Sequence, residues 1–88
     1  MSNKYLQIHP NDNVLAALRN LYKGDPIKHN GREFILATDT HAKHKFATRD
    51  LEVGESIIMY GTLVGKAVRP IAKGETITLE GDYSLVSV

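Results

Sequence analysis

An eleven-residue motif that occurs three times constrains the fold of this chain more than any other feature. It reads ATRDLEVGESI at residues 47–57 and AVRPIAKGETI at residues 67–77, and a fainter copy, ALRNLYKGDPI, lies at residues 17–27. The shared pattern is Ala-x-Arg-x-Leu/Ile-x-x-Gly-Asp/Glu-x-Ile. The last two copies begin 20 residues apart, which is too short for a helical crossover between parallel strands. We therefore expect local connections between the repeated units.

Each position of the motif has a physical interpretation. The Ala suits close packing, and the Leu or Ile can enter a core. The Gly supplies the positive φ that a tight turn needs, and the acidic residue keeps that turn solvated. The final Ile opens a β-branched strand. Each copy is thus predicted to be a turn, or one turn of helix, that leads into a strand.

The rest of the chain adds further strand signals. Strands are expected at residues 4–8, 34–37, 57–60 and 77–79, and Asn30-Gly31 is typical of a tight hairpin turn between Ile27 and Phe34. The predicted fold is mostly β, built of short strands with one or two short helical turns.

Residues 12–23 support two interpretations. Near-helical spacing is shared by Val14, Leu18, Leu21 and Tyr22. N-caps are available at Asn11 and Asp12, and a C-cap at Gly24. The motif instead aligns this segment with turns that lead into strands. We favour a strand at residues 13–18 followed by a helical turn.

Composition narrows the class of protein. The 88 residues suffice for one small domain, and 42% of them are hydrophobic. Without cysteine there is neither a disulfide nor a thiolate, and without a long apolar run we expect no membrane span or secretory signal, which fits a cytoplasmic protein. The 11 basic and 10 acidic residues lack the excess of cations typical of nucleic-acid binders. We expect neither nucleic acid nor membrane as a partner.

The motif resembles the signature of SAF domains, which adopt the β-clip fold. Residues 8–14, IHPNDNV, resemble the opening of the altronate/galactarate dehydratase family. His44-Lys45-Phe46-Ala47, followed by Asp50-Leu51, resembles the family's His-Lys-x-Ala-x-x-Asp-Ile/Leu stretch. The resemblance runs in order over residues 4–80. Lys43 is a departure, because family members often carry Gly there.

The resemblance implies a β-clip (SAF-like) domain over residues 1–82, with residues 83–88 as a tail or the start of a linker. It implies the N-terminal domain or small subunit of a metal-dependent hydro-lyase that dehydrates a sugar acid, with D-altronate converted to 2-keto-3-deoxy-gluconate. The implied partner is a C-terminal catalytic region or large subunit, without which we expect the chain to be inactive; a homo-oligomer is a further option. The alternative is a non-catalytic β-clip module that binds a carbohydrate or a protein.

Histidines stand at positions 9, 29, 41 and 44, and no pair has a recognised metal-ligand spacing. The resemblance singles out His9 and His44. It implies catalytic roles for His44 and Lys45, substrate binding by His9 and Lys45, and Fe(II) or Mn(II) ligation by His9 and His44 together with the catalytic region. The plainer alternative is that these are ordinary surface side chains. For Asp12 and Asp50, capping and closing turns are good structural roles.

Overall fold

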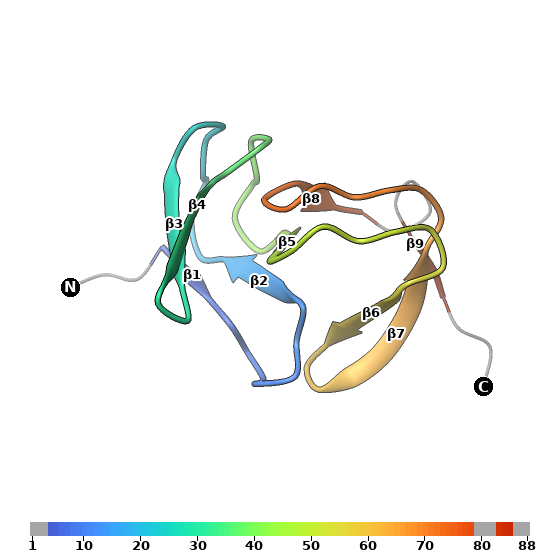
Figure 1. Cartoon of the computed structure of the whole chain (residues 1–88). Helices are drawn as coiled ribbons and strands as arrows, with labels where there is room; N and C mark the ends of the chain where they lie inside the picture. The colour runs from blue at the N-terminus through green and yellow to red at the C-terminus, as the bar shows by residue number, and fades with distance from the viewer. Residues whose placement is uncertain (1–3, 79–82, 86–88) are drawn as a thin grey trace.

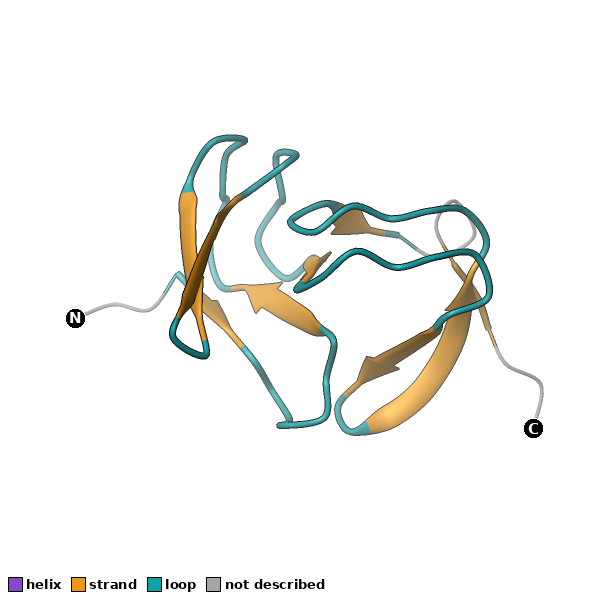
Figure 2. Cartoon of the chain, viewed as in Figure 1, coloured by secondary structure: helices purple, strands orange, loops and turns teal. Residues whose placement is uncertain are grey.

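The computed structural model describes residues 4–78 and 83–85, which form short β-strands joined by turns and loops (Figure 1). Figure 2 shows no helix in this part of the chain, and none there could cross a membrane. The mostly β prediction is confirmed, whereas the expected helical turns are wrong for the described residues. The strands are β1 (Tyr5–Leu6), β2 (Val14–Ala17), β3 (Pro26–His29), β4 (Arg32–Ile35), β5 (Lys45–Ala47), β6 (Ser56–Met59), β7 (Thr62–Ala67), β8 (Thr76–Ile77) and β9 (Tyr83–Leu85).

The strands form three small antiparallel sheets. A central sheet has the order β1-β2-β5-β8, β3 and β4 form a separate hairpin, and the third sheet has the order β6-β7-β9. In Figure 1 the β3–β4 and β6–β7 hairpins lie on opposite sides of β2 and β5. The two hairpins therefore flank the central sheet.

Both hairpins close through two residues with positive φ. These are Asn30 and Gly31 (φ 52° and 76°) in the first hairpin and Tyr60 and Gly61 (φ 55° and 74°) in the second. Such turns match the twist of paired strands. The first was predicted, and Ile27 does pair with Phe34.

The segment with two interpretations is a strand. Val14–Ala17 pairs with β1 on one side and β5 on the other, and all four residues are buried. Leu18 and Tyr22, which contributed to the helical spacing, are 50% and 60% exposed. The helical alternative is wrong because backbone pairing on both sides overrides the local periodicity.

The C-terminal end of the described chain adds a strand to the second hairpin. Tyr83 of β9 pairs with Ala67 of β7. Leu79 of the expected strand at 77–79 and residues 86–88 of the expected tail lie outside the described residues. The domain boundary stays a prediction.

Two hydrophobic clusters make up the core. One gathers Leu15, Ala17, Leu21, Ile27, Leu36 and Phe46; the other gathers Val14, Ala47, Leu51, Ile57, Met59, Ala67, Ile71 and Ile77. Successive strand residues face opposite ways. The neighbours Val14 and Leu15 therefore feed different clusters, and β2 is shared by both.

The turn of the repeated motif occurs four times in the backbone, although only three copies are recognisable in the sequence. In the three recognised copies the N–H of the ninth residue donates to the carbonyl of the sixth at 2.9–3.0 Å, from Asp25, Glu55 and Glu75. The same bond joins His44 N to His41 O at 3.0 Å. Residues 36–46, LATDTHAKHKF, are therefore a further copy. In chain order the copies are the first (17–27), second (36–46), third (47–57) and fourth (67–77).

The four copies are paired by backbone hydrogen bonds. Leu21 and Thr40 exchange two bonds of 2.8 and 2.9 Å, and Leu51 and Ile71 exchange two of 2.8 Å. In each pair, the N–H of the eighth motif residue of one copy also donates to the carbonyl of the first motif residue of the other copy. The bond from Lys43 N to Ala17 O, at 2.7 Å, is an example. Residues 17–46 and 47–77 are thus two similar halves, each with one pair of copies and one hairpin.

Candidate functional site

The second copy lacks the side chains that stabilise the other turns. In the first copy Asp25 accepts from Tyr22 N at 2.9 Å, and in the third Glu55 accepts from Glu52 N at 3.1 Å. At the same position the second copy has His44. Its other departures are Thr38 for the Arg, Thr40 for the Leu or Ile, and Lys43 for the Gly.

Ion pairs reinforce two of the ordinary copies. Arg49 pairs with Glu55 and Arg69 with Glu75, each at 2.6 Å. The Arg49 guanidinium, followed by the N–H of Glu52, holds the pKa of the Glu55 carboxyl below its ordinary value of 4.5. With Thr38 and His44 at the corresponding positions, the second copy has no side chains for this ion pair.

The turn of the second copy instead presents basic and imidazole groups. Lys43 occupies the glycine position with φ 75°, a conformation that disfavours a residue with a Cβ by roughly 1–2 kcal/mol. His44 is exposed, and its ring meets that of His41 edge-on with centroids 5.9 Å apart. A shallow hollow of about 340 Å³ adjoins this turn, lined by Lys43, His44, Lys45, Met59, Ile77, Thr78 and Tyr83.

Lys45 connects this turn to the second hairpin. It lies on β5 and is half-buried; its Nζ donates to Lys43 O at 3.2 Å and lies 5.4 Å from the centre of the Tyr60 ring. A cation over an aromatic face is attracted by the ring quadrupole. The ammonium group is therefore held between the His44 turn and the tip of the β6–β7 hairpin.

His9 packs on the other residue of that hairpin turn. A Cβ built on Gly61 would lie 2.7 Å from His9 Cδ2, so Gly61 is required for this close approach as well as for its positive φ. Asn11 N donates to His9 Nδ1 at 3.1 Å. Nδ1 is then an acceptor, and the proton of the neutral ring is on Nε2. A ligating histidine usually donates its other N–H, so this arrangement favours His9 as a donor through Nε2.

The Asp-Asn pair that follows His9 clamps the N-terminal loop to the second hairpin. The buried Asp12 carboxylate accepts from Gly61 N at 2.8 Å, Tyr60 N at 3.0 Å and His9 N at 3.2 Å. The Asn13 side chain donates to Ser56 O at 2.8 Å and accepts from Ile58 N at 2.9 Å. The structural role expected of Asp12 is confirmed.

Asp50 also has its expected structural role, since its Oδ1 accepts from Lys73 N at 2.8 Å. Neither Asp12 nor Asp50 is needed as a catalytic acid to account for its position.

Of the predicted site residues, Lys45 lies near both the turn that carries His44 and the tip of the β6–β7 hairpin, on which His9 packs. It shares the hollow with His44 and approaches Tyr60, while His9 touches Gly61. Among residues 4–78 and 83–85, no three His, Cys, Asp or Glu side chains are gathered so that they could hold a metal ion. Ligation by His9 and His44 stays a prediction that requires ligands from another region.

Sequence reasoning predicted His44 as a site residue through the resemblance alone; it missed the second copy, which places His44 at the position of the turn acid. The available signal was spacing: the recognised copies begin at residues 17, 47 and 67, and the wider first interval leaves room for one more. It also assigned no role to Tyr60, which lies beneath Lys45.

The paired turns that lead into short strands define a β-clip domain of the SAF type. The family model described as the altronate/galactarate dehydratase SAF domain matches residues 3–81, and the chain belongs to this family. It is 36% identical over 73 residues to an altronate dehydratase of Bacillus subtilis (strain 168) and 37% identical over 71 residues to one of Escherichia coli (strain K12). These matches cover 83% and 81% of this chain but only 15% and 14% of the relatives.

Proposed function

We propose that this domain forms part of a hydro-lyase that dehydrates a sugar acid, D-altronate, to 2-keto-3-deoxy-gluconate. The observation that carries the proposal is the second copy, in which turn-stabilising residues are replaced by Lys43 and His44 beside Lys45. The similarity to two altronate dehydratases supports the choice of substrate. Because the chain spans about a seventh of their length, the proposal assigns the remaining machinery to a C-terminal region or large subunit.

Dehydration of a sugar acid removes the proton alpha to the carboxylate, and the β-hydroxyl, protonated by an acid, leaves as water; the resulting enol tautomerises to the 2-keto acid. Imidazole is the side chain most often used for such proton transfers, and the exposed His44 is assigned this role. The Lys45 ammonium, fixed by Lys43 O and Tyr60, is assigned to the substrate carboxylate. His9, with its proton on Nε2, is assigned to donate to a substrate oxygen.

A divalent metal, Fe(II) or Mn(II), would make the alpha proton more acidic by binding the carboxylate. The described residues do not by themselves fit such an ion, since they include no three-ligand cluster. Most metal ligands would then come from the catalytic region, and the roles of His44, Lys45 and His9 do not depend on the metal.

The test is D-altronate dehydration by the chain alone and with the catalytic region, with Fe(II) or Mn(II) supplied. Activity is expected only in the mixture, and His44→Ala is expected to lower kcat by about 100-fold or more. The matched control is His41→Ala, which removes a neighbouring exposed imidazole; circular dichroism verifies folding of both variants. A catalytic region that is indifferent to this chain, or to His44→Ala, would favour a non-catalytic assembly module instead.

A further inference from the structure

A second hollow lies beside the first hairpin and is lined by none of the residues around the His44 hollow. Its volume of about 630 Å³ falls in the range of roughly 300–1,000 Å³ typical of small-molecule sites. Its walls come from five separate stretches of the chain. They are Gln7, Pro10, Asn11, Asp12, Asn13, His29, Asn30, Arg32, Phe34, Thr48, Arg49, Ile58 and Lys73, and we call this hollow the hairpin groove.

The hairpin groove carries an excess of positive charge. Three of its side chains are cations, namely Arg32, Arg49 and Lys73, and its one carboxylate is Asp12. Asp12 is 7% exposed and accepts three backbone N–H groups. Its charge is therefore neutralised in part by fixed dipoles, and the groove favours an anion.

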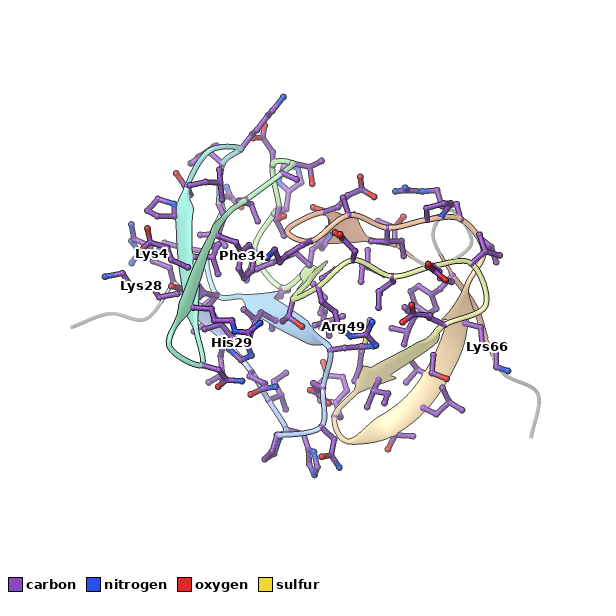
Figure 3. All side chains as sticks on the ribbon, in the orientation of Figure 1. Lys4, Lys28, His29, Phe34, Arg49 and Lys66 are labelled. Atoms are coloured by element: carbon purple, nitrogen blue, oxygen red, sulfur yellow. The ribbon has the colours of Figure 1, made fainter. Side chains whose placement is uncertain are left out.

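The cations differ in how far they are engaged. Arg49 shares its charge with Glu55 at 2.6 Å, and Lys73 Nζ lies 5.5 Å from the centre of the Phe34 ring. Within the described part of the chain, Arg32 makes no ion pair, although it lies directly opposite His29 across β3 and β4. In Figure 3, His29 and Arg49 lie between the two hairpins, whereas Lys66 lies on the far side of β7. Arg32 is the cation with most capacity for a ligand.

Neutral polar groups complete the groove. Gln7, Asn13 and Thr48 use their side chains within the protein, where Gln7 Nε2 donates to Asp12 O at 3.0 Å and Thr48 Oγ1 to Asn13 O at 3.1 Å. These side chains are therefore already engaged in hydrogen bonds within the protein. Asn11 and Asn30 add further amides to the lining, and the Asn30 Nδ2 lies 3.2 Å from His29 Nε2. A small ligand with one anionic group and several hydroxyls matches this combination of cations and amides.

We propose that the hairpin groove is a second ligand site, separate from the His44 hollow, that binds the carboxylate and hydroxyls of a sugar acid. The anionic, hydroxylated class follows from the groove, while the choice of a sugar acid rests on the proposed function. Arg32 and Lys73 bind the carboxylate, and the amides bind hydroxyls.

The test titrates the 88-residue chain with D-altronate, D-altritol and inorganic phosphate, followed by NMR. Altronate is expected to shift the amides of residues 29–32, 48–49 and 73. Altritol, which has the hydroxyls without the carboxylate, is expected to bind at least roughly ten-fold more weakly, because it loses the charge-assisted hydrogen bonds. Arg32→Gln is expected to weaken altronate binding by a similar factor, and Lys66→Gln to leave it unchanged.

Equal binding of altronate and altritol, or equal effects of the Arg32 and Lys66 substitutions, would overturn the site. Phosphate binding as tight as that of altronate would overturn the sugar-acid assignment. If the altronate-induced shifts are lost in the complex with the catalytic region, the groove is covered by that region. The groove would then be a binding site for a protein segment and not for a small ligand. If the complex is active but altronate does not bind the groove, only the groove proposal is rejected. If altronate binds the groove but the complex is inactive, only the proposed dehydratase function is rejected.

Discussion

The two pairs of turns share one backbone arrangement but close through different side chains. In the second half Leu51 faces Ile71 inside an apolar cluster. In the first half Leu21 faces Thr40, whose hydroxyl is bonded to Thr76 Oγ1 at 2.6 Å. The reciprocal backbone bonds are alike in both pairs. Because these bonds use no side-chain atoms, one copy can change its residues while the fold stays the same.

The first pair also shows how the altered copy is supported. Asn20 Oδ1 accepts from Ala42 N at 2.9 Å, and Asp39 Oδ1 accepts from Lys23 N at 2.8 Å, so each copy of the pair caps the turn of the other. The turn of the second copy therefore has one stabilising hydrogen bond that does not involve its own ninth residue. That position can carry His44 in place of an acid.

The largest expected change in stability comes from placing a threonine, as at Thr40 in the first pair of turns, at the equivalent apolar position of the second pair. Leu51→Thr should lower the free energy of unfolding by about 3 kcal/mol, because it shortens a buried side chain and places a hydroxyl among apolar groups. Urea denaturation measures the change. Leu51→Val is the matched control, since Val and Thr have nearly the same shape. It should lower the free energy of unfolding by only about 1–2 kcal/mol, because it adds no buried hydroxyl.

The reciprocal substitution in the first pair sharpens this comparison. Thr40→Val removes a hydroxyl that is hydrogen-bonded, so it should also destabilise, by about 1 kcal/mol. If Thr40→Val were stabilising, or if Leu51→Thr and Leu51→Val were equivalent, the two pairs would not differ in the way described.

A smaller effect, of opposite sign, is expected at the turn of the second copy. Lys43→Gly should raise the free energy of unfolding by about 1 kcal/mol, because glycine adopts φ 75° without steric strain. The same denaturation experiment applies. Gly54→Lys places the lysine in the equivalent turn of the third copy, at φ 88°, and should destabilise. A destabilised Lys43→Gly variant would mean that the Lys43 side chain contributes to the fold.

The smallest expected effect concerns pH. The pKa of Glu55 is lowered in the folded state, so the carboxylate contributes stability above its unfolded value of 4.5, and this is lost as the pH falls through the folded pKa. Glu55→Gln should therefore reduce stability near neutral pH but not in acid. Denaturation across this range measures the difference. Glu33→Gln, in a looser exposed pair with Lys28 at 3.9 Å, should change little; equal profiles for both variants would contradict the prediction.

The sequence predicted the β fold because three copies retain the glycine and the apolar residue that mark the turn. The second copy escaped detection since Thr40 and Lys43 remove both marks, and the backbone bonds that define it leave no sequence pattern. The spacing of Leu18 and Tyr22 suggested a helix only because exposed apolar residues are indistinguishable from core residues in the sequence.

The candidate site could be predicted from the sequence only in part. His9, His44 and Lys45 were selected through the resemblance, and no local pattern predicts that His9 rests on Gly61 or that Lys45 lies over Tyr60. The hairpin groove was not predicted. Its cations Arg32, Arg49 and Lys73 are far apart in the sequence and are brought to one groove by the β3–β4 hairpin and the paired turns of the third and fourth copies.

The division of β2 between the two hydrophobic clusters sets where the chain can change length. An inserted residue in β2 would exchange the directions of Val14 and Leu15, so that each would point away from its own cluster. The β6–β7 hairpin already carries one additional residue, Val64, at the register shift between Ile57 and Ile58. Related sequences should therefore show insertions and deletions in the hairpins, while β2 keeps its length.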